Sequence, residues 1–263
     1  MTQTPNLLNI LSPNNIIIYM LIFTRLTGMM QRAPFFSTIS APMLTKVWFS
    51  ATIAFLIYPI VYVQKYFIVP HNMPELAILI LIEFFIGYLI GYIAEMIIQG
   101  VQVTGSILSI QMGLSMSQAL DPVTGIQSTE LSRIYVFLAT LLFIGTGAYQ
   151  MLFTTVFSSF QAIPMGAVPV FDANVVMTCC QLFSSMFRIG MGIALPVFAV
   201  LLTSDVLLGM MSKMMPQMNI YMVALPVKIY IGLFLTLAFL SAVTVFLQGV
   251  ISNYMEVLSK IFT

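Results

Sequence analysis

The chain has 263 residues, of which 60% are hydrophobic and only 6% are charged, and its formal net charge is +1. Soluble domains are about 45–50% hydrophobic and about 25% charged, so this composition excludes a water-soluble globule and predicts a surface covered by lipid or by other proteins. Acidic and basic runs are absent from the sequence, which leaves no electrostatic footprint for nucleic acid, and we expect no nucleic-acid partner.

Six apolar runs approach the length of about 20 residues that a helix needs to cross the hydrocarbon core of a membrane. They occupy residues 15–30, 47–64, 76–98, 134–160, 175–211 and 229–255. The fourth and sixth runs contain no charged residue and are the clearest. The fifth is interrupted by Gly190, Gly192 and Pro196, so it is either two helices or one kinked helix. The sequence therefore predicts an all-α membrane protein with about six long hydrophobic helices.

The third run carries a stripe of small and acidic residues. Glu83, Gly87, Gly91 and Glu95 recur every four residues and follow one side of a helix. The two glycines permit close contact with another helix. The two carboxylates either serve a proton or cation relay, or are satisfied by donors of a neighbouring helix or lie near the membrane interface.

The fifth run contains one basic and one acidic residue, Arg188 and Asp205. Because unpaired charges at membrane depth are unfavourable, we expect a buried ion pair or contacts with a partner protein. Motifs for a catalytic nucleophile, a phosphate loop or a metalloprotease are missing from the sequence. We therefore expect no enzyme, no catalytic residues, no cofactor and no metal site.

Residues 100–133 form the least regular apolar stretch. Glycine, serine and glutamine interrupt it, and Asp121 is followed by Pro122. Irregular backbone at membrane depth must be buried in protein or line an aqueous cavity. The stretch is a candidate for a loop that enters or closes a pore, and a polar loop folded over the membrane face is the alternative.

Several motifs follow one another along nearly the whole chain. RLTGMMQRAPFFSTISAPMLTK occupies residues 25–46, QMG residues 111–113 and DPVTG residues 121–125, while SKMMPQMNIY and LPVKIYIG fall within residues 195–232. Together with the stripe of the third run, this order resembles the R subunit of the bacterial flagellar type III export gate, the FliR family. The injectisome counterpart of that subunit is the T subunit.

The resemblance implies a P-type helix bundle in residues 1–188, with a re-entrant loop near 105–122, joined to a Q-type helical hairpin in residues 189–263. It implies assembly with P-type and Q-type subunits (FliP and FliQ), and with the B-type and A-type subunits (FlhB and FlhA). The location would be the bacterial inner membrane at the flagellar basal body, in contact with membrane lipid. Unfolded secreted polypeptides would be the substrates, and not every apolar run would need to cross lipid.

The resemblance also implies two sets of functional residues. A pore plug would seal the closed gate with apolar side chains and move aside by virtue of its glycines and serines. The plug residues are Gly105, Ser106, Ile107, Leu108, Ile110, Gln111, Met112, Gly113, Leu114, Met116, Asp121 and Pro122. A subunit-contact motif consists of Pro216, Gln217, Met218, Asn219, Pro226 and Lys228.

Two alternatives stay open from the sequence. One is the injectisome T subunit, although SKMMPQMNIY favours the flagellar form. The other belongs to a different class, a proton-coupled secondary transporter that uses Glu83, Glu95 and Arg188. Such a transporter is typically built from an internal repeat, and the sequence shows none.

Overall fold

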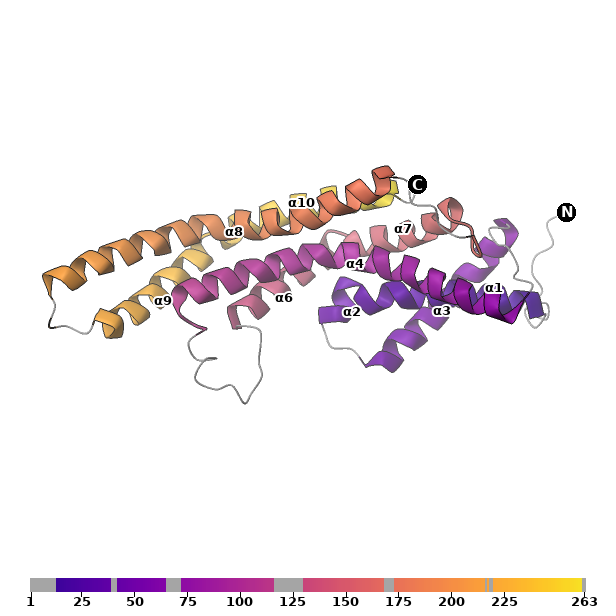
Figure 1. Ribbon diagram of the computed structural model, residues 1–263, viewed down its shortest axis with the longest axis horizontal. Coiled ribbons are helices and arrows are strands. Elements are labelled where there is room, and N and C mark those ends of the chain that lie inside the picture. Colours follow the sequence, from indigo (N-terminus) through magenta and orange to yellow (C-terminus); the bar gives the residue numbers. More distant parts are fainter. Residues whose placement is uncertain are drawn as a thin grey trace. The chain divides into compact units, whose positions relative to one another are not determined.

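The computed structural model describes residues 13–38, 42–64, 72–115, 130–167, 173–215, 217 and 220–261. Within these ranges α-helices make up nearly all of the chain (Figure 1). They are α1 (Pro13–Arg32), α2 (Pro34–Thr38), α3 (Met43–Gln64), α4 (Met73–Met112), α6 (Glu130–Gly145), α7 (Ala148–Ala162), α8 (Ala173–Met214), α9 (Ile220–Ala238) and α10 (Leu240–Ile261). The predicted all-α class is confirmed.

Not every described helix has the length and hydropathy of a membrane span. Within the described ranges three helical segments qualify alone, Met43–Tyr62, Met73–Met112 and Val175–Met214. The number rises to five if α6 with α7, and α9 with α10, each count as one broken span. The predicted membrane protein of long hydrophobic helices agrees with this, since the sequence did not require every apolar run to cross lipid. The first run does form a helix, α1, but its two arginines and other polar residues keep it out of this set.

The third apolar run continues well beyond its predicted end at residue 98. Helix α4 has 40 residues and reaches Met112, so residues 105–112 are helical and the prediction of an irregular loop is wrong for them. Glycines that suggested irregular backbone instead permit close helix crossings. A Cβ atom added to Gly100 would meet the carbonyl oxygen of Met186 at 2.7 Å, and one added to Gly105 would meet the backbone of Ser132.

Of the three other long runs, the fourth and sixth differ from prediction, and the fifth forms one helix, which was one of its two predicted alternatives. The fourth is broken at Thr146 and Gly147, where Gly147 adopts a φ of +74°. The fifth is one continuous helix, α8, although Pro196 lies inside it. The sixth begins at Ile220 rather than at residue 229 and bends by 54° at the break between α9 and α10.

The chain divides into two compact units. Unit 1 comprises residues 1–96, 143–182 and 251–263. In its described part, α1 buries one face whose residues recur at helical spacing of three and four. These residues are Ile18, Leu21, Ile22, Leu26, Met29 and Met30, and α4 and α7 contribute further buried side chains such as Ile86, Ile90, Val156 and Phe160.

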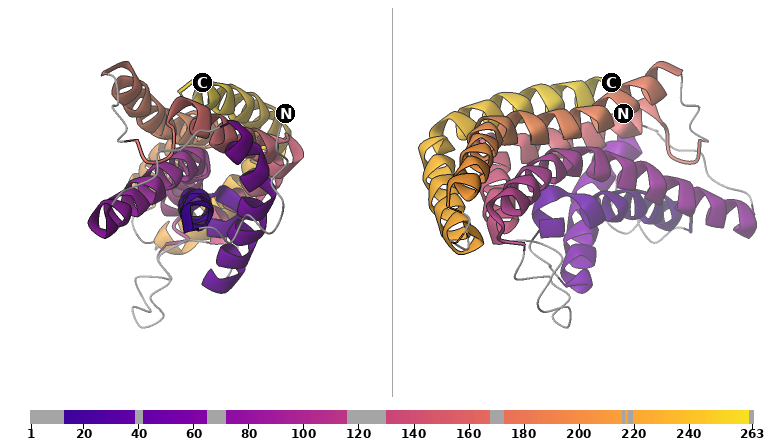
Figure 2. Two further views of the ribbon diagram at one scale, coloured as in Figure 1. Left: turned by 90° about the vertical axis from the view of Figure 1, so that its right-hand side faces the viewer. Right: turned by 60° about the vertical axis from the view of Figure 1, so that its left-hand side comes forward.

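Unit 2 comprises residues 97–142 and 183–250. Within it, residues 183–214 of α8 run in the opposite direction to α9 and residues 240–250 of α10 and form a hairpin with them, which Figures 1 and 2 show from three sides. Its core joins this hairpin to the second half of α4 and to α6. The buried core residues include Val101, Leu108, Met112, Tyr135, Ile193, Val197, Leu201 and Leu247.

Candidate functional site

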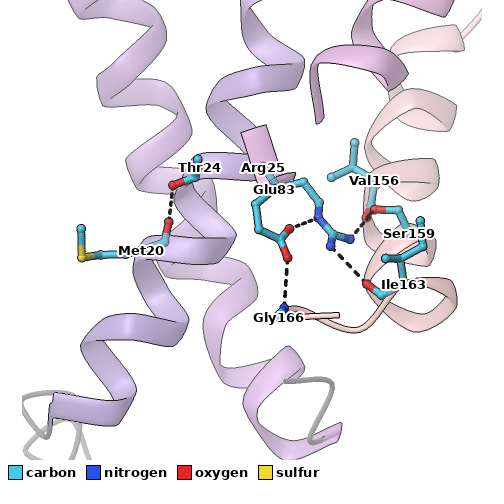
Figure 3. A network of polar contacts seen from close by, with 8 residues as sticks. All are labelled: Met20, Thr24, Arg25, Glu83, Val156, Ser159, Ile163 and Gly166. Carbon is cyan, nitrogen blue, oxygen red and sulfur yellow. Dashed lines mark hydrogen bonds and ion pairs between the residues drawn. The ribbon is translucent and has the colours of Figure 1, made fainter. Parts of the chain in front are cut away.

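Unit 1 contains a fully buried charged residue, Arg25 of α1, whose side chain is 0% exposed. Its Nε atom donates to Oε2 of Glu83 in α4 at 2.6 Å, and Glu83 is itself only 1% exposed. Its other nitrogens donate at 3.1 Å to the hydroxyl of Ser159 and to the carbonyl oxygen of Ile163 (Figure 3). The second carboxylate oxygen of Glu83 accepts the N–H of Gly166 at 3.3 Å.

Neighbouring groups further compensate the buried charges of this network. Arg25 lies over the ring of Phe160, with 4.4 Å from guanidinium carbon to ring centroid, a cation–π contact. The hydroxyl of Ser159 donates to the carbonyl of Val156 at 2.6 Å, so it is oriented to accept from Arg25. A buried ion pair is stable only when further hydrogen bonds satisfy both partners, and this pair meets that condition.

A second ion pair joins the same two helices nearer the end of α1. Arg32 donates to Glu95 at 3.3 Å and to the hydroxyl of Tyr88 at 2.7 Å. Its guanidinium also faces the rings of Tyr88 and Tyr92. The Arg32 side chain is 39% exposed, whereas that of Glu95 is 7% exposed. Both carboxylates of the stripe are therefore satisfied by arginines of a neighbouring helix, which is one of the two interpretations left open by the sequence.

Because Arg25 is buried and Arg32 is partly exposed, we expect the two arginines to contribute differently to the free energy of unfolding. We expect Arg32→Gln to lower the free energy of unfolding by no more than about 1 kcal/mol, because solvent screens a half-exposed pair and glutamine still donates to Tyr88. Denaturation of the purified chain in mixed micelles measures this. A loss of several kcal/mol would mean that Arg32 is buried in the folded protein and would contradict the structure.

The glycines of the stripe lie where α1 and α4 touch. A Cβ atom added to Gly87 would overlap the carbonyl oxygen of Arg25, and one added to Gly91 would meet the carbonyl oxygen of Met29 at 2.5 Å. From the other helix, a Cβ added to Gly28 would overlap the carbonyl oxygen of Phe84. This close approach brings the arginines of α1 within reach of the carboxylates of α4.

The predicted plug residues from Gly105 to Leu114 lie at the end of α4, in unit 2. Ser106 and Ser132 of α6 form a hydrogen bond of 3.1 Å. Leu108 and Met112 are fully buried, whereas Ile107 and Leu114 are partly buried and Ile110 is exposed. The remaining predicted plug residues, Met116, Asp121 and Pro122, lie outside the described residues.

Helix α4 ends in a Schellman motif centred on Gly113. Gly113 adopts a φ of +80°, and its N–H donates to the carbonyl of Ile110 at 3.0 Å. The N–H of Leu114 donates to the carbonyl of Ser109, also at 3.0 Å. A side chain at position 113 would be strained by this backbone conformation and would meet Leu225 of α9 at 2.5 Å.

Three polar side chains from three helices meet at the same place. The amide nitrogen of Gln111 in α4 donates to Oδ2 of Asp205 in α8 at 2.7 Å. The ammonium group of Lys228 in α9 pairs with Oδ1 of Asp205. Asp205 is 33% exposed and Lys228 is 20% exposed. One carboxylate thus connects α4, α8 and α9, and we call these three side chains the polar latch.

The polar latch gives Asp205 the ion pair expected of it, whereas Arg188 forms none within the described part of the chain. Asp205 pairs with Lys228, and Arg188 is exposed and makes no ion pair among the residues that the structure describes. The two residues lie 17 positions apart on one continuous helix, too far to touch. Lys228 also lies inside α9 rather than at its start, and Asp205 compensates its charge there.

The predicted subunit-contact motif is only partly described. Gln217 is exposed, and Pro226 is an exposed residue inside α9. Pro216, Met218 and Asn219 lie outside the described residues. In the described part of the chain, no group of three His, Cys, Asp or Glu side chains is placed to hold a metal ion.

Sequence reasoning missed Arg25, the central residue of the unit 1 network, although it was part of a recognised motif. The signal that could have found it is a charged residue on the apolar face of α1, spaced three and four residues from Ile22, Leu21 and Met29. Such a residue needs a buried acidic partner, and few carboxylates lie in apolar runs. Ser159 and the carbonyl of Ile163 carry no comparable signal in the sequence.

Long apolar helices with internally compensated charges define an integral membrane protein of the all-α class. A sequence profile of the family described as "Bacterial export proteins, family 1" matches residues 16–254. The chain therefore belongs to this family of bacterial export proteins.

Relatives from several bacteria share most of the chain's length. It is 27% identical over 245 residues to the flagellar biosynthetic protein FliR of Bacillus subtilis (strain 168), covering 92% of this chain and 93% of the relative. FliR of Escherichia coli (strain K12) is 26% identical over 239 residues, covering 91% and 90%. The surface presentation of antigens protein SpaR of Shigella sonnei is 28% identical over 153 residues, covering 58% and 59%.

Proposed function

We propose that the chain is the R-type core subunit of the type III protein export gate of the bacterial flagellum. With P-type and Q-type subunits it forms the entrance pore for unfolded export substrates. The observation that carries this proposal is the similarity to two FliR proteins over at least 90% of both chains. The protein acts as a structural and gating component rather than as an enzyme, and other subunits and the proton gradient supply the energy for export.

The proposal includes the bacterial inner membrane as the location and a composite architecture. Residues 1–188 correspond to a P-type bundle, and residues 189–263 to a Q-type hairpin that contacts neighbours through Gln217, Pro226 and the residues around them. The antiparallel course of α8 with α9 and α10 supports the second part. Large apolar side chains also remain exposed on this hairpin and need lipid or sibling subunits to cover them. They include Val206, Leu207, Met210, Met222, Phe234 and Leu237.

Affinity purification in mild detergent tests the assignment. A tagged chain should co-purify with small membrane proteins of P and Q type, together with the B-type and A-type subunits. Deleting its gene should abolish flagella, and the tagged copy should restore them. A chain that purifies alone from cells that make flagella, with no sibling subunit attached, would contradict the proposal.

The proposed plug extends from the end of α4 into residues 116–122. Three properties of the described part support this role: it ends at a glycine with positive φ, it exposes Ile110, and its other apolar side chains are held by unit 2. An apolar constriction excludes water and thereby stops ion leakage through a resting pore. Because Leu108 and Met112 are fully buried, their replacement would damage the fold rather than test the seal.

A linker exchange beyond the described helix separates sealing from folding. We expect replacement of residues 116–122 by an equally long Gly/Ser linker to make the inner membrane leaky to small ions while the subunits still co-purify. Potassium efflux from resting cells measures the leak. The matched control is an equally long Gly/Ser exchange in the segment 65–71 between α3 and α4, which should leave efflux unchanged. An assembled complex with unaltered efflux would contradict the plug.

The injectisome T subunit is the second candidate, and one observation favours it. SpaR of Shigella sonnei shares 28% identity with the chain, but over 58% of its length only. Complementation distinguishes the two systems. The chain should restore motility to a bacterium that lacks its own flagellar R subunit, and secretion by an injectisome lacking the T subunit should stay absent.

The transporter hypothesis loses its main support in the structure. Glu83 and Glu95 accept hydrogen bonds from Arg25 and Arg32, which favours a role as partners of those cations over a role as relay sites. Arg188, the third residue of that hypothesis, is exposed on α8. Transport of a small solute by the purified chain without sibling subunits would restore this alternative.

A further inference from the structure

We propose that the polar latch, formed by Gln111, Asp205 and Lys228, holds the end of α4 in its resting position and that its release is a step in opening the gate. Asp205 is the central positioning residue because it alone contacts both other members. This inference rests on the proposed function, since it assigns a regulatory role to the helix end from which the plug continues.

The geometry at the end of α4 combines one polar contact with several apolar ones. Met112 is fully buried, and its sulfur lies only 2.7 Å from where a Cβ on Gly232 of α9 would be. Leu225 of α9 lies against Gly113. These contacts fit the helix end closely against α9, but apolar contacts have little directional preference.

The polar latch fixes an orientation of the end of α4 that the apolar contacts alone do not fix. Gln111 is one residue before Met112 and bonds to α8 instead of α9. A hydrogen bond to a charged group is stronger than one between neutral groups and depends on geometry, so it fixes the rotation of the helix end. Asp205 uses one carboxylate oxygen for Gln111 and the other for Lys228, so a single side chain of α8 connects α4 and α9.

The exposure of the latch suits a contact that has to open. Arg25 and Glu83 in unit 1 are sealed from solvent, whereas Asp205 and Lys228 are 33% and 20% exposed. Exposed and partly exposed ion pairs add little net stability and exchange readily with water. A displacement of α8 away from the end of α4 would break the bond between Asp205 and Gln111 and free Gln111 together with the start of the plug.

The first measurement reports on the helix end directly and does not depend on export. A nitroxide is attached to Ser115→Cys in a chain whose free cysteines, Cys179 and Cys180, are replaced by alanine, within the full purified complex. We expect Asp205→Asn to narrow the electron paramagnetic resonance spectrum of this nitroxide, because the end of α4 becomes more mobile. The charge swap Asp205→Lys with Lys228→Asp should restore the broad spectrum, since glutamine can donate or accept.

The second measurement reports on the gate. In complexes of normal composition, Asp205→Asn and Lys228→Gln should each raise resting potassium efflux about fivefold, the factor expected when one partly exposed pair is lost. The charge swap should return efflux to the parent level. The matched control is Lys213→Gln, which removes an exposed cation from α8, the helix that carries Asp205. It should leave both measurements unchanged.

The outcomes separate this inference from the proposed function. Identical spectra in the parent and in Asp205→Asn would overturn the latch, as would a leak from the 116–122 linker exchange but not from the latch variants. If the linker exchange itself does not leak, the proposed gating function fails, and the spectra still decide whether the latch holds the helix end. Should Asp205→Asn disrupt assembly, Gln111→Met breaks the same bond to α4 and leaves the Asp205–Lys228 pair in place.

Discussion

Replacing Gly87 with alanine should destabilise the packing of α1 on α4 by at least about 3 kcal/mol, the upper end of the range for overpacked cores. The added methyl group would overlap the carbonyl oxygen of Arg25, which is backbone and cannot rotate away. The helices would have to separate, and the arginines of α1 would then lose their carboxylate partners in α4. We expect strongly reduced amounts of folded chain in membranes and a lower free energy of unfolding in mixed micelles.

Gly249 in α10 provides the matched control. A Cβ atom there would meet nothing within 4 Å, so Gly249→Ala should leave the chain as stable as before or gain about 0.5–1 kcal/mol from helix propensity. Comparing Gly87→Ala with Gly249→Ala separates the effect of helix contact on stability from the effect of helix propensity. Equal effects at both positions would show that α1 and α4 do not touch at Gly87.

Replacing Arg25 with methionine should lower the free energy of unfolding by about 3–5 kcal/mol, the range for breaking a buried ion pair from one side. The substitution keeps much of the side-chain volume but leaves the Glu83 carboxylate, 1% exposed, without its main compensating charge. It also removes the donors to Ser159 and to the carbonyl of Ile163. Unfolding of the purified chain, followed by helix content, measures the loss.

A double-mutant cycle with Glu83→Leu completes this test. Removing both charges leaves no buried ion, so the double variant should be more stable than either single variant. The carbonyl of Ile163 and the N–H of Gly166 still lose their partners, which limits the recovery. Additive losses in the cycle would mean that Arg25 and Glu83 do not form a pair in the folded protein.

The apolar runs predicted where helices lie better than where they end. Helices α1, α3 and α8 agree with predicted runs because each is bounded by polar or proline-containing sequence. The end of α4 was misplaced because Gly100 and Gly105 have the same sequence signal whether they break a helix or let another helix approach. The break at Gly147 was missed because a single glycine within a long apolar run usually stays helical.

For the candidate sites as well, the sequence indicated some of the polar residues that matter but not the residues that they contact. The stripe in the third run already indicated a helix contact with acidic residues, and its position on α4 agrees with that. Its arginine partners could not be predicted, because Arg25 and Glu83 are 58 residues apart and only tertiary packing brings them together. The partner of Asp205 could not be named for the same reason, since Lys228 had been treated as the boundary of an apolar run.

The distance along the chain between Arg25 and its partners also constrains biosynthesis. Glu83 is synthesised 58 residues after Arg25, and Ser159 follows 134 residues after it. Until α4 and α7 have emerged from the ribosome, the guanidinium group of Arg25 lacks these two acceptors, and its burial in lipid would be unfavourable. Helix α1 therefore has to wait in the insertion machinery or at the bilayer surface, and it takes its final place only after later helices have been translated.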